Sequence, residues 1–111
     1  MFVRKEKRMD KVKIFKALGN ETRLNILLWL KDPQKNFAPQ IHLSVMDDFK
    51  EGVCVGAIRK VTGLSQSTIS GFLSILEEAE LVESRNIGQY TYFRRNEKTI
   101  KEIIDWMKIE L

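Results

Sequence analysis

The chain has 111 residues, of which 43% are hydrophobic, and a formal net charge of +4. This length suits one domain, residues 1–111, with a single core, and no apolar run reaches the roughly 18 residues of a membrane span. The lone cysteine, Cys54, excludes an internal disulfide framework, and the basic N-terminus lacks the apolar stretch of a signal peptide. We therefore expect a soluble, cytoplasmic protein.

Basic side chains gather at the N-terminus, where residues 1–16 carry seven of them. They form either a solvated tail or part of a nucleic-acid contact, with which the overall charge is compatible without being decisive. Residues 9–18 predict a short amphipathic helix with Val12, Phe15 and Leu18 along its apolar face. We expect Gly19 to end this helix in the left-handed conformation.

The next segment predicts a central helix. Asn20 is a suitable N-cap for residues 21–31, and the helix should end at Asp32, because the residue before a proline is driven out of the helical region. Its apolar residues are distributed around nearly the whole circumference of the helix, which is typical of a helix covered on several sides. They are Leu24, Ile26, Leu27, Leu28 and Leu30.

Residues 32–50 predict a long loop, because two prolines and several polar residues oppose a long helix. Residues 41–45 alternate weakly and allow a short strand. His42 lies between two apolar residues, a position in which a satisfied structural histidine is commoner than a ligand.

Residues 55–79 predict a helix-turn-helix. The turn is Thr62–Gly63, and Ser65 caps the second helix. One face of that helix is apolar and the opposite face small and polar, with no charge between Gly63 and Leu76. Such a surface suits close approach to nucleic-acid base edges. The apolar face comprises Ile69, Phe72, Leu73 and Leu76, and the polar face Gln66, Ser67, Ser70 and Ser74.

Residues 81–96 predict a two-stranded hairpin, since aromatic and polar residues alternate over 90–95 and residues 86–89 form the turn. A helix-turn-helix followed by such a hairpin is a winged helix. The predicted fold is therefore mainly α with a small β-hairpin, of about five helices plus a two-stranded wing.

Residues 97–111 predict a terminal helix with more apolar surface than so small a domain can cover. We expect the same helix of a second subunit to cover it, assisted by the helix at 9–18; packing within one chain is the alternative. The predicted dimer interface comprises Val12, Phe15, Ile100, Ile103, Ile104 and Met107.

Two stretches, KALGNETRLNILLWL and VGAIRKVTGLSQSTISGFLSILEEAELVESRNIGQYTYF, resemble the ArsR/SmtB family of winged-helix transcriptional repressors. The resemblance covers about residues 12–96, with 32–50 as an apparent insertion. It implies a homodimer whose two recognition helices enter successive major grooves of a palindromic operator in double-stranded DNA. It also implies release by some signal, such as an unidentified inducer.

The chain departs from this family at its metal sites. The family's Cys-Val-Cys motif is Cys54-Val55-Gly56 here, and the last helix has no histidine. One thiolate does not complete a soft-metal site, so we expect no metal and no cofactor, and a His42–Cys54 site shared across a dimer is the weaker hypothesis. The signal that releases DNA is then open: it is a redox switch at Cys54, a small molecule, a protein partner, or there is none. If Cys54 is not a switch, it is a core residue.

Two further departures concern the second helix of the motif. Gly71 occupies a position inside the helix where it would allow close approach to a neighbouring helix or to DNA. Glu80 stands where the family usually has a helix-ending glycine.

We expect Gln66 to read bases, because its amide can pair with adenine at two points. Short hydrogen bonds to phosphates or base edges are expected from Ser65, Ser67, Thr68 and Ser70. Contacts to the DNA backbone are expected from Lys60, Arg85 and Gln89, with Arg94 or Arg95. The alternative is a winged-helix protein-interaction module that binds no DNA. An enzyme has no support, because no nucleophile–base pair, phosphate loop or paired acids are present.

Overall fold

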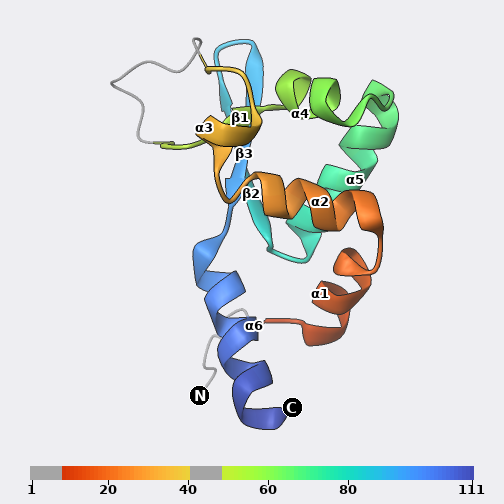
Figure 1. Ribbon diagram of the computed structural model, residues 1–111, viewed down its shortest axis with the longest axis vertical. Helices are drawn as coiled ribbons and strands as arrows, with labels where there is room; N and C mark the ends of the chain where they lie inside the picture. Colours follow the sequence, from red (N-terminus) through yellow and green to blue (C-terminus); the bar gives the residue numbers. More distant parts are fainter. Residues whose placement is uncertain (1–8, 41–48) are drawn as a thin grey trace, which may run out of the picture.

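The computed structural model describes residues 9–40 and 49–111, which form six helices and three strands (Figure 1). In chain order these are α1 (Lys11–Leu18), α2 (Glu21–Trp29), α3 (Pro33–Asn36), β1 (Val53–Cys54), α4 (Val55–Thr62), α5 (Gln66–Glu78), β2 (Val82–Ile87), β3 (Tyr90–Arg95) and α6 (Glu97–Glu110). The mainly α fold with a helix-turn-helix and a β-hairpin wing is confirmed. The hairpin tip and α4 lie at one end of the molecule, and α1 and α6 at the other.

Helices α2 and α5 begin where the sequence predicts, whereas α1 begins at Lys11, two residues later than expected. The Asn20 side chain accepts a hydrogen bond from the Arg23 amide at 3.0 Å, and the Ser65 hydroxyl accepts one from the Thr68 amide at 3.2 Å. Each cap satisfies an amide that has no partner within the helix. Gly63 has a φ of 72°, so the turn between α4 and α5 uses the left-handed conformation.

The expectation that Gly19 adopts the left-handed conformation is wrong, because its φ is −77°. The carbonyls at the end of α1 are satisfied in another way. The Gly19 amide donates to the Lys16 carbonyl at 3.2 Å, and the Arg23 guanidinium donates to the Ala17 carbonyl at 2.7 Å. A left-handed cap is therefore not needed here.

The sheet has three antiparallel strands in the order β1–β3–β2, so the prediction of a two-stranded wing omitted one strand. Val53 pairs with Phe93 and Cys54 with Tyr92. Two residues are too short to show the alternation that reveals a strand in a sequence.

The predicted loop at 32–50 contains α3, a single helical turn that begins with Pro33 and is capped by the Asp32 side chain. This turn is too short for a periodic apolar face to reveal it. The weak strand at 41–45 and His42 lie outside the described residues.

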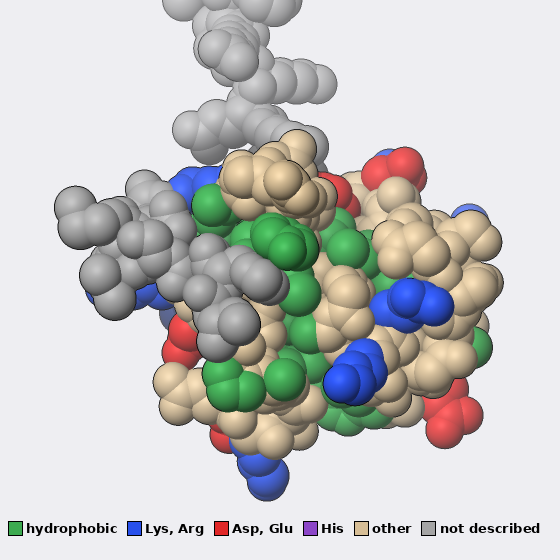
Figure 2. All heavy atoms as spheres, turned by 90° about the horizontal axis from the view of Figure 1, so that it is seen from above, with side chains coloured by type: hydrophobic (Ala, Val, Ile, Leu, Met, Phe, Trp, Pro, Cys, Tyr) green, Lys and Arg blue, Asp and Glu red, His purple; other side chains and the backbone are tan. Residues whose placement is uncertain are grey.

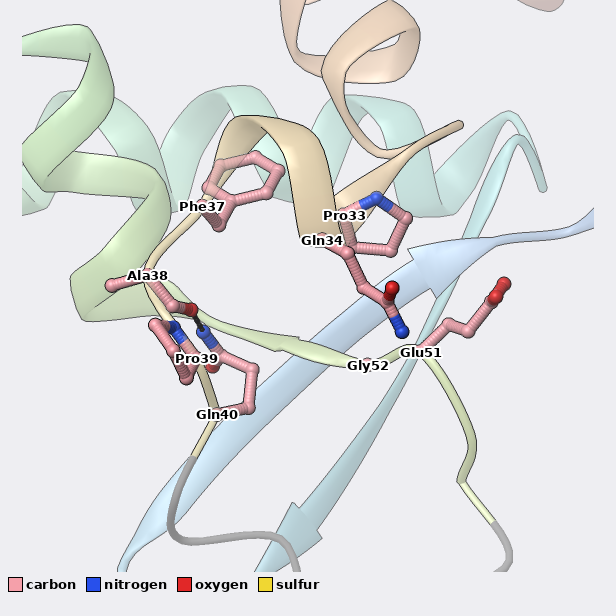
Figure 3. A pocket seen from close by; sticks show the side chains of 8 residues that line it. All are labelled: Pro33, Gln34, Phe37, Ala38, Pro39, Gln40, Glu51 and Gly52. Atoms are coloured by element: carbon pink, nitrogen blue, oxygen red, sulfur yellow. Dashed lines mark hydrogen bonds between the residues drawn. The ribbon is translucent and has the colours of Figure 1, made fainter.

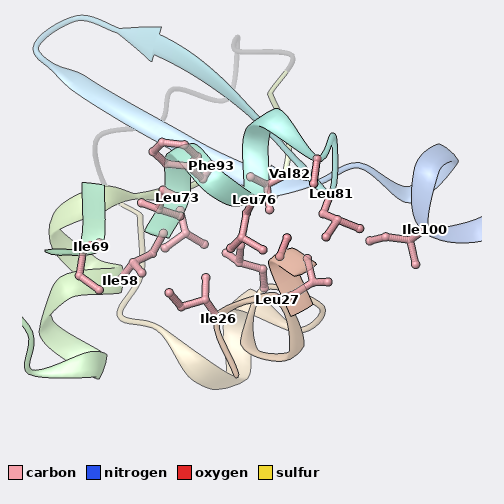
Figure 4. Close-up of a cluster of buried hydrophobic side chains, with 14 of the residues drawn as sticks. Ile26, Leu27, Ile58, Ile69, Leu73, Leu76, Leu81, Val82, Phe93 and Ile100 are labelled. Carbon is pink, nitrogen blue, oxygen red and sulfur yellow. The ribbon is translucent and has the colours of Figure 1, made fainter. Parts of the chain in front are cut away.

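The hydrophobic core forms where α2, α4, α5 and the sheet meet (Figure 4). The predicted apolar face of α5 is confirmed, since Ile69, Leu73 and Leu76 are buried and Phe72 is half-buried. Burial of each such side chain contributes roughly 1.5–3 kcal/mol. These contacts fix α5 against the body of the molecule by one side only, which leaves its polar side exposed.

The expectation that α2 is covered on several sides is wrong for the single chain. Its Ile26, Leu27 and Leu30 are buried, but Leu24 is 39% exposed and Leu28 54% exposed. One chain supplies too few elements to surround this helix.

At the other end of the molecule, α1 and α6 each bury one face. The core takes Ile14 and Ala17 from α1, and Ile100 and Ile103 from α6. The rings of Phe15 and Trp106 join the two helices with their centroids 6.4 Å apart. Among the described residues, no helix is long and apolar enough to cross a membrane.

Candidate nucleic-acid interface

The helix-turn-helix presents the N-terminal half of α5 to solvent. Ile58 of α4 and Ile69 of α5 are both fully buried in the core, and Gly63 forms the turn between their helices. Ser65, Gln66, Ser67, Thr68 and Ser70 are all exposed. The structure therefore brings together these five residues of the predicted site on one projecting helix end.

Two kinds of role separate within this group. The Ser65 hydroxyl donates to the Thr68 hydroxyl at 2.9 Å in addition to accepting from its amide, so this pair builds the N-cap. The Gln66 amide donates to the Ser70 hydroxyl, one turn further along, at 3.5 Å, and the Ser65 and Ser67 hydroxyls lie 3.5 Å apart. Gln66, Ser67 and Ser70 are the side chains that leave polar groups available to a partner.

Gly71 lies on the exposed part of α5, and a Cβ atom built on it meets no atom of the described residues within 4 Å. Close packing against a neighbouring helix of the same chain therefore does not explain this glycine. Of the two sequence interpretations, approach to an external partner remains.

Positive charge lies beside α5, not on it. Arg59 and Lys60 are exposed at the end of α4 and line a shallow hollow of about 350 Å³ together with Gly56, Gly63 and Leu64. The end-on view in Figure 2 shows basic side chains beside hydrophobic ones on this end of the molecule. Sequence reasoning named Lys60 and missed Arg59, although its place next to Lys60 in the last turn of α4 was a usable signal.

The wing presents a polar tip. Gly88 has a φ of 62° in the turn, Gln89 is exposed beside it, and the Thr91 hydroxyl donates to the Asn86 side chain at 2.7 Å across the hairpin. Tyr90, at 41% exposure, is a second residue at this tip that the sequence analysis did not name. Arg85 lies on β2 with its guanidinium 5.0 Å from the centre of the Phe49 ring.

Arg94 and Arg95 lie away from the tip of the wing, although Arg94 shares the Phe49 ring with Arg85. They pair with Glu83 and Val82 at the end of the hairpin opposite to the Gly88 turn. The Arg94 guanidinium bonds to Glu83 at 2.7 Å and stacks over the Phe49 ring at 4.1 Å. Strand alternation shows which residues share a face but not which arginines form ion pairs, so the sequence could not show that Arg94 and Arg95 are engaged within the chain.

Arg95 is held even more firmly, because its side chain is only 10% exposed. Its guanidinium bonds to Glu97 at 2.9 Å and to the Leu27 carbonyl at 3.4 Å. These bonds link the base of the wing to α6 and α2.

The predicted dimer residues divide into two groups. Ile100 and Ile103 are buried in the chain's own core. Val12 is 63% exposed, Phe15 and Ile104 are each 41% exposed, and Met107 is half-buried.

Cys54 is half-buried at the end of β1, where its amide donates to the Gln40 side chain at 2.9 Å. A pocket of about 430 Å³ lies next to it between α3 and the start of β1 (Figure 3). Apolar groups of Pro33, Phe37 and Pro39 form one part of its lining, and Glu51 and Gly52 another. Within residues 9–40 and 49–111, no three histidine, cysteine or acidic side chains gather in a way that could hold a metal ion.

Sequence comparison links the chain to bacterial regulators. A family model described as "Bacterial regulatory protein, arsR family" matches residues 42–84. The chain is 43% identical to the uncharacterized HTH-type transcriptional regulator YbzH of Bacillus subtilis (strain 168), over 93% of this chain and 100% of YbzH. It is 28% identical to the transcriptional repressor SdpR of the same organism, over 85% of this chain and 84% of SdpR.

Solved structures agree with these relatives. The homodimeric winged helix-turn-helix DNA-binding domain Mb0332 from Mycobacterium bovis is 26% identical with a TM-score of 0.60, over 90% of this chain and 77% of that one. HlyU from Vibrio cholerae N16961 is also 26% identical with a TM-score of 0.60, over 86% of this chain and 85% of its own. The family and the fold are those of transcriptional regulators and not of enzymes.

Proposed function

We propose, since this chain belongs to the arsR family of bacterial regulatory proteins, that it is a homodimeric repressor that binds a palindromic operator in double-stranded DNA in the cytoplasm. The observation that carries the proposal is the exposed N-terminal half of α5, which is small, polar and uncharged and has cations on neighbouring elements. A helix of this kind enters a major groove without a bulky side chain to keep it out.

Sequence preference and affinity then come from different elements. Gln66, Ser67 and Ser70 read base edges, while Arg59 and Lys60 of α4, with Arg85 and Gln89 of the wing, contact phosphates. Arg94 and Arg95 are omitted from the proposed phosphate contacts, because their ion pairs with Glu83 and Glu97 hold them at the base of the wing. Arg59 is added to these contacts.

A second copy of the chain is the partner that the exposed hydrophobic side chains fit best. Val12, Phe15 and Ile104 lie on the two helices at the end of the molecule opposite to the wing tip. The relative Mb0332 is homodimeric, which supports the same assembly here. Two identical reading helices related by a two-fold axis require an operator with the same symmetry.

Selection of bound duplexes from a random pool tests the proposal directly. We expect enriched sequences with two inverted half-sites whose centres lie about one helical turn, or a multiple of it, apart. Enrichment of a single unpaired half-site would contradict the dimeric arrangement, and recovery of no sequence above background would contradict operator binding.

The rival function is a winged-helix module that binds only proteins. The salt dependence of DNA binding distinguishes it from the proposed function. Each phosphate contact contributes a slope of about −0.9 to the log–log dependence of affinity on salt, so a dimer should show a slope of several units. Binding to the selected duplex should be measured by fluorescence anisotropy between low and physiological salt. A flat response would exclude DNA as the main partner.

A further inference from the structure

Arg23, near the start of α2, contacts two other helices at once, α1 and α5. Its guanidinium donates from Nε to the Ala17 carbonyl at 2.7 Å and from an Nη atom to the Lys16 carbonyl at 3.2 Å. Both carbonyls belong to the last turn of α1, where backbone acceptors lack helical partners and the helix dipole favours a cation. Arg23 thereby fixes the end of α1 against the start of α2.

The same guanidinium also touches the recognition helix. Its central carbon lies 5.4 Å from the centre of the Phe72 ring of α5. Phe72 is half-buried, two residues beyond Ser70 of the polar reading face. The Arg23 amide is itself held by the Asn20 cap at 3.0 Å, so the side chain starts from a fixed backbone position.

We infer that Arg23 is a positioning residue for DNA reading, which sets where α5 lies relative to α1. The inference rests on the proposed function, because α1 carries part of the proposed dimer surface and α5 the reading face. In a dimer, the orientation of α5 relative to α1 determines the distance between the two reading helices, and an error in one subunit is repeated in the other.

The chemistry of this position requires arginine. A guanidinium presents several donors in one plane and an aromatic-stacking face perpendicular to them, so it can bond two carbonyls while it stacks on a ring. A lysine ammonium keeps the charge but is a point donor without a stacking face. Arg23→Lys therefore keeps the electrostatic attraction to the end of α1 and removes the directional connection to Phe72.

The test uses the duplex selected by the native protein and copies of it with one or two base pairs inserted between the half-sites. The native protein should prefer the selected spacing, and Arg23→Lys should reduce that preference by about tenfold, which corresponds to 1.4 kcal/mol. Phe72→Leu should reduce the spacing preference in the same way. The double variant should lose little more of this preference than either single variant, since both substitutions remove the same Arg23–Phe72 contact. Lys31→Ala, which removes an exposed charge at the end of α2, is the control and should keep the native preference.

A merely structural role for Arg23 predicts something different. Affinity would then fall by the same factor for every spacing, in proportion to the loss of folded dimer, and this outcome would overturn the inference. Failure of the native protein to prefer any duplex would instead overturn the proposed function.

Hydrogen exchange tests the inference without DNA. In Arg23→Lys, amide exchange should accelerate in α5 and at the end of α1 while α6 keeps its native rate. Equal acceleration in all three helices would show general destabilisation and would contradict a positioning role.

Discussion

Among residues 9–40 and 49–111, two residues other than glycine lie in the left-handed region of the backbone, Glu51 with a φ of 63° and Glu80 with a φ of 61°. Glu80 follows Ala79, the C-cap residue of α5, and its amide donates to the Glu77 carbonyl at 2.9 Å, while the Leu81 amide donates to the Leu76 carbonyl at 3.0 Å. This pattern is a helix C-cap that normally uses glycine, because a Cβ atom costs roughly 1–2 kcal/mol in the left-handed conformation.

Glu80→Gly should therefore stabilise the fold by about 1 kcal/mol, because relief of strain exceeds the added flexibility of the unfolded chain. Thermal unfolding at a fixed protein concentration measures the effect. Glu80→Ala is the matched control, since it removes the same carboxylate but keeps the Cβ atom. A glycine variant no more stable than the alanine variant would show that strain at this position is negligible.

Substitutions of single residues should separate overall affinity for DNA from preference for one DNA sequence. Gln66→Ala should weaken binding to the selected duplex by about 1–3 kcal/mol and reduce the ratio of its affinities for selected and random duplex, because the proposed role of this side chain is to read bases. Gln89→Ala on the wing should weaken both duplexes alike, because a phosphate contact carries no sequence information. An unchanged ratio in Gln66→Ala would remove this residue as the base reader. Competition binding at one salt concentration measures both.

At the scale of elements, Phe49 attaches the start of β1 to the wing. Its side chain is buried, and its ring lies 4.1 Å from the Arg94 guanidinium and 5.0 Å from that of Arg85. Gly52 permits this arrangement, because a Cβ atom there would lie 2.6 Å from the Phe49 ring and 3.2 Å from Tyr92 Cβ. Strand β1 thus depends on Gly52 and on the ring of Phe49, three residues before it.

Gly52→Ala should destabilise the fold by about 1–3 kcal/mol, the usual cost of overpacking a buried site. Gly56→Ala in α4 is the matched control, because a Cβ atom there meets no atom within 4 Å in the part of the chain that the structure describes, and alanine favours a helix by up to about 1 kcal/mol. Urea unfolding of the two variants should move the midpoint in opposite directions. Equal stability of Gly52→Ala and the native protein would show that the Phe49 ring moves aside freely.

At the scale of the whole molecule, hydrophobic surface remains at the end where α1 and α6 meet. Phe15 contacts Trp106 within the chain and is still 41% exposed, while Ile100 and Ile103 are already buried. The proposed dimer surface is therefore the outer part of α1 and α6 and not the full apolar stripe of the terminal helix.

Phe15→Glu should raise the dissociation constant of the dimer by about 30-fold or more, because a carboxylate without a partner is costly to bury in an interface. Sedimentation equilibrium at micromolar concentration measures the change. Val61→Glu is the control, since Val61 has a similar exposure of 42% but lies on α4. A Phe15→Glu protein that stays dimeric would place the interface elsewhere.

Much of the fold and of the reading face follows from local sequence signals. The Asn20 and Ser65 caps, the Gly63 turn and the apolar spacing of α5 each involve residues within about four positions, so their physical chemistry is visible in the sequence. The absence of charge between Gly63 and Leu76 is likewise a property of the sequence alone.

Tertiary structure decided what depends on residues far apart in the chain. The pairing of Val53 with Phe93 creates the third strand, and the ion pairs of Arg94 and Arg95 remove two cations from the proposed DNA-contacting set. The contact of Arg23 with both α1 and Phe72 exists only once three helices have packed together. Local periodicity determined which elements form, whereas long-range packing decided which side chains those elements leave available to a partner.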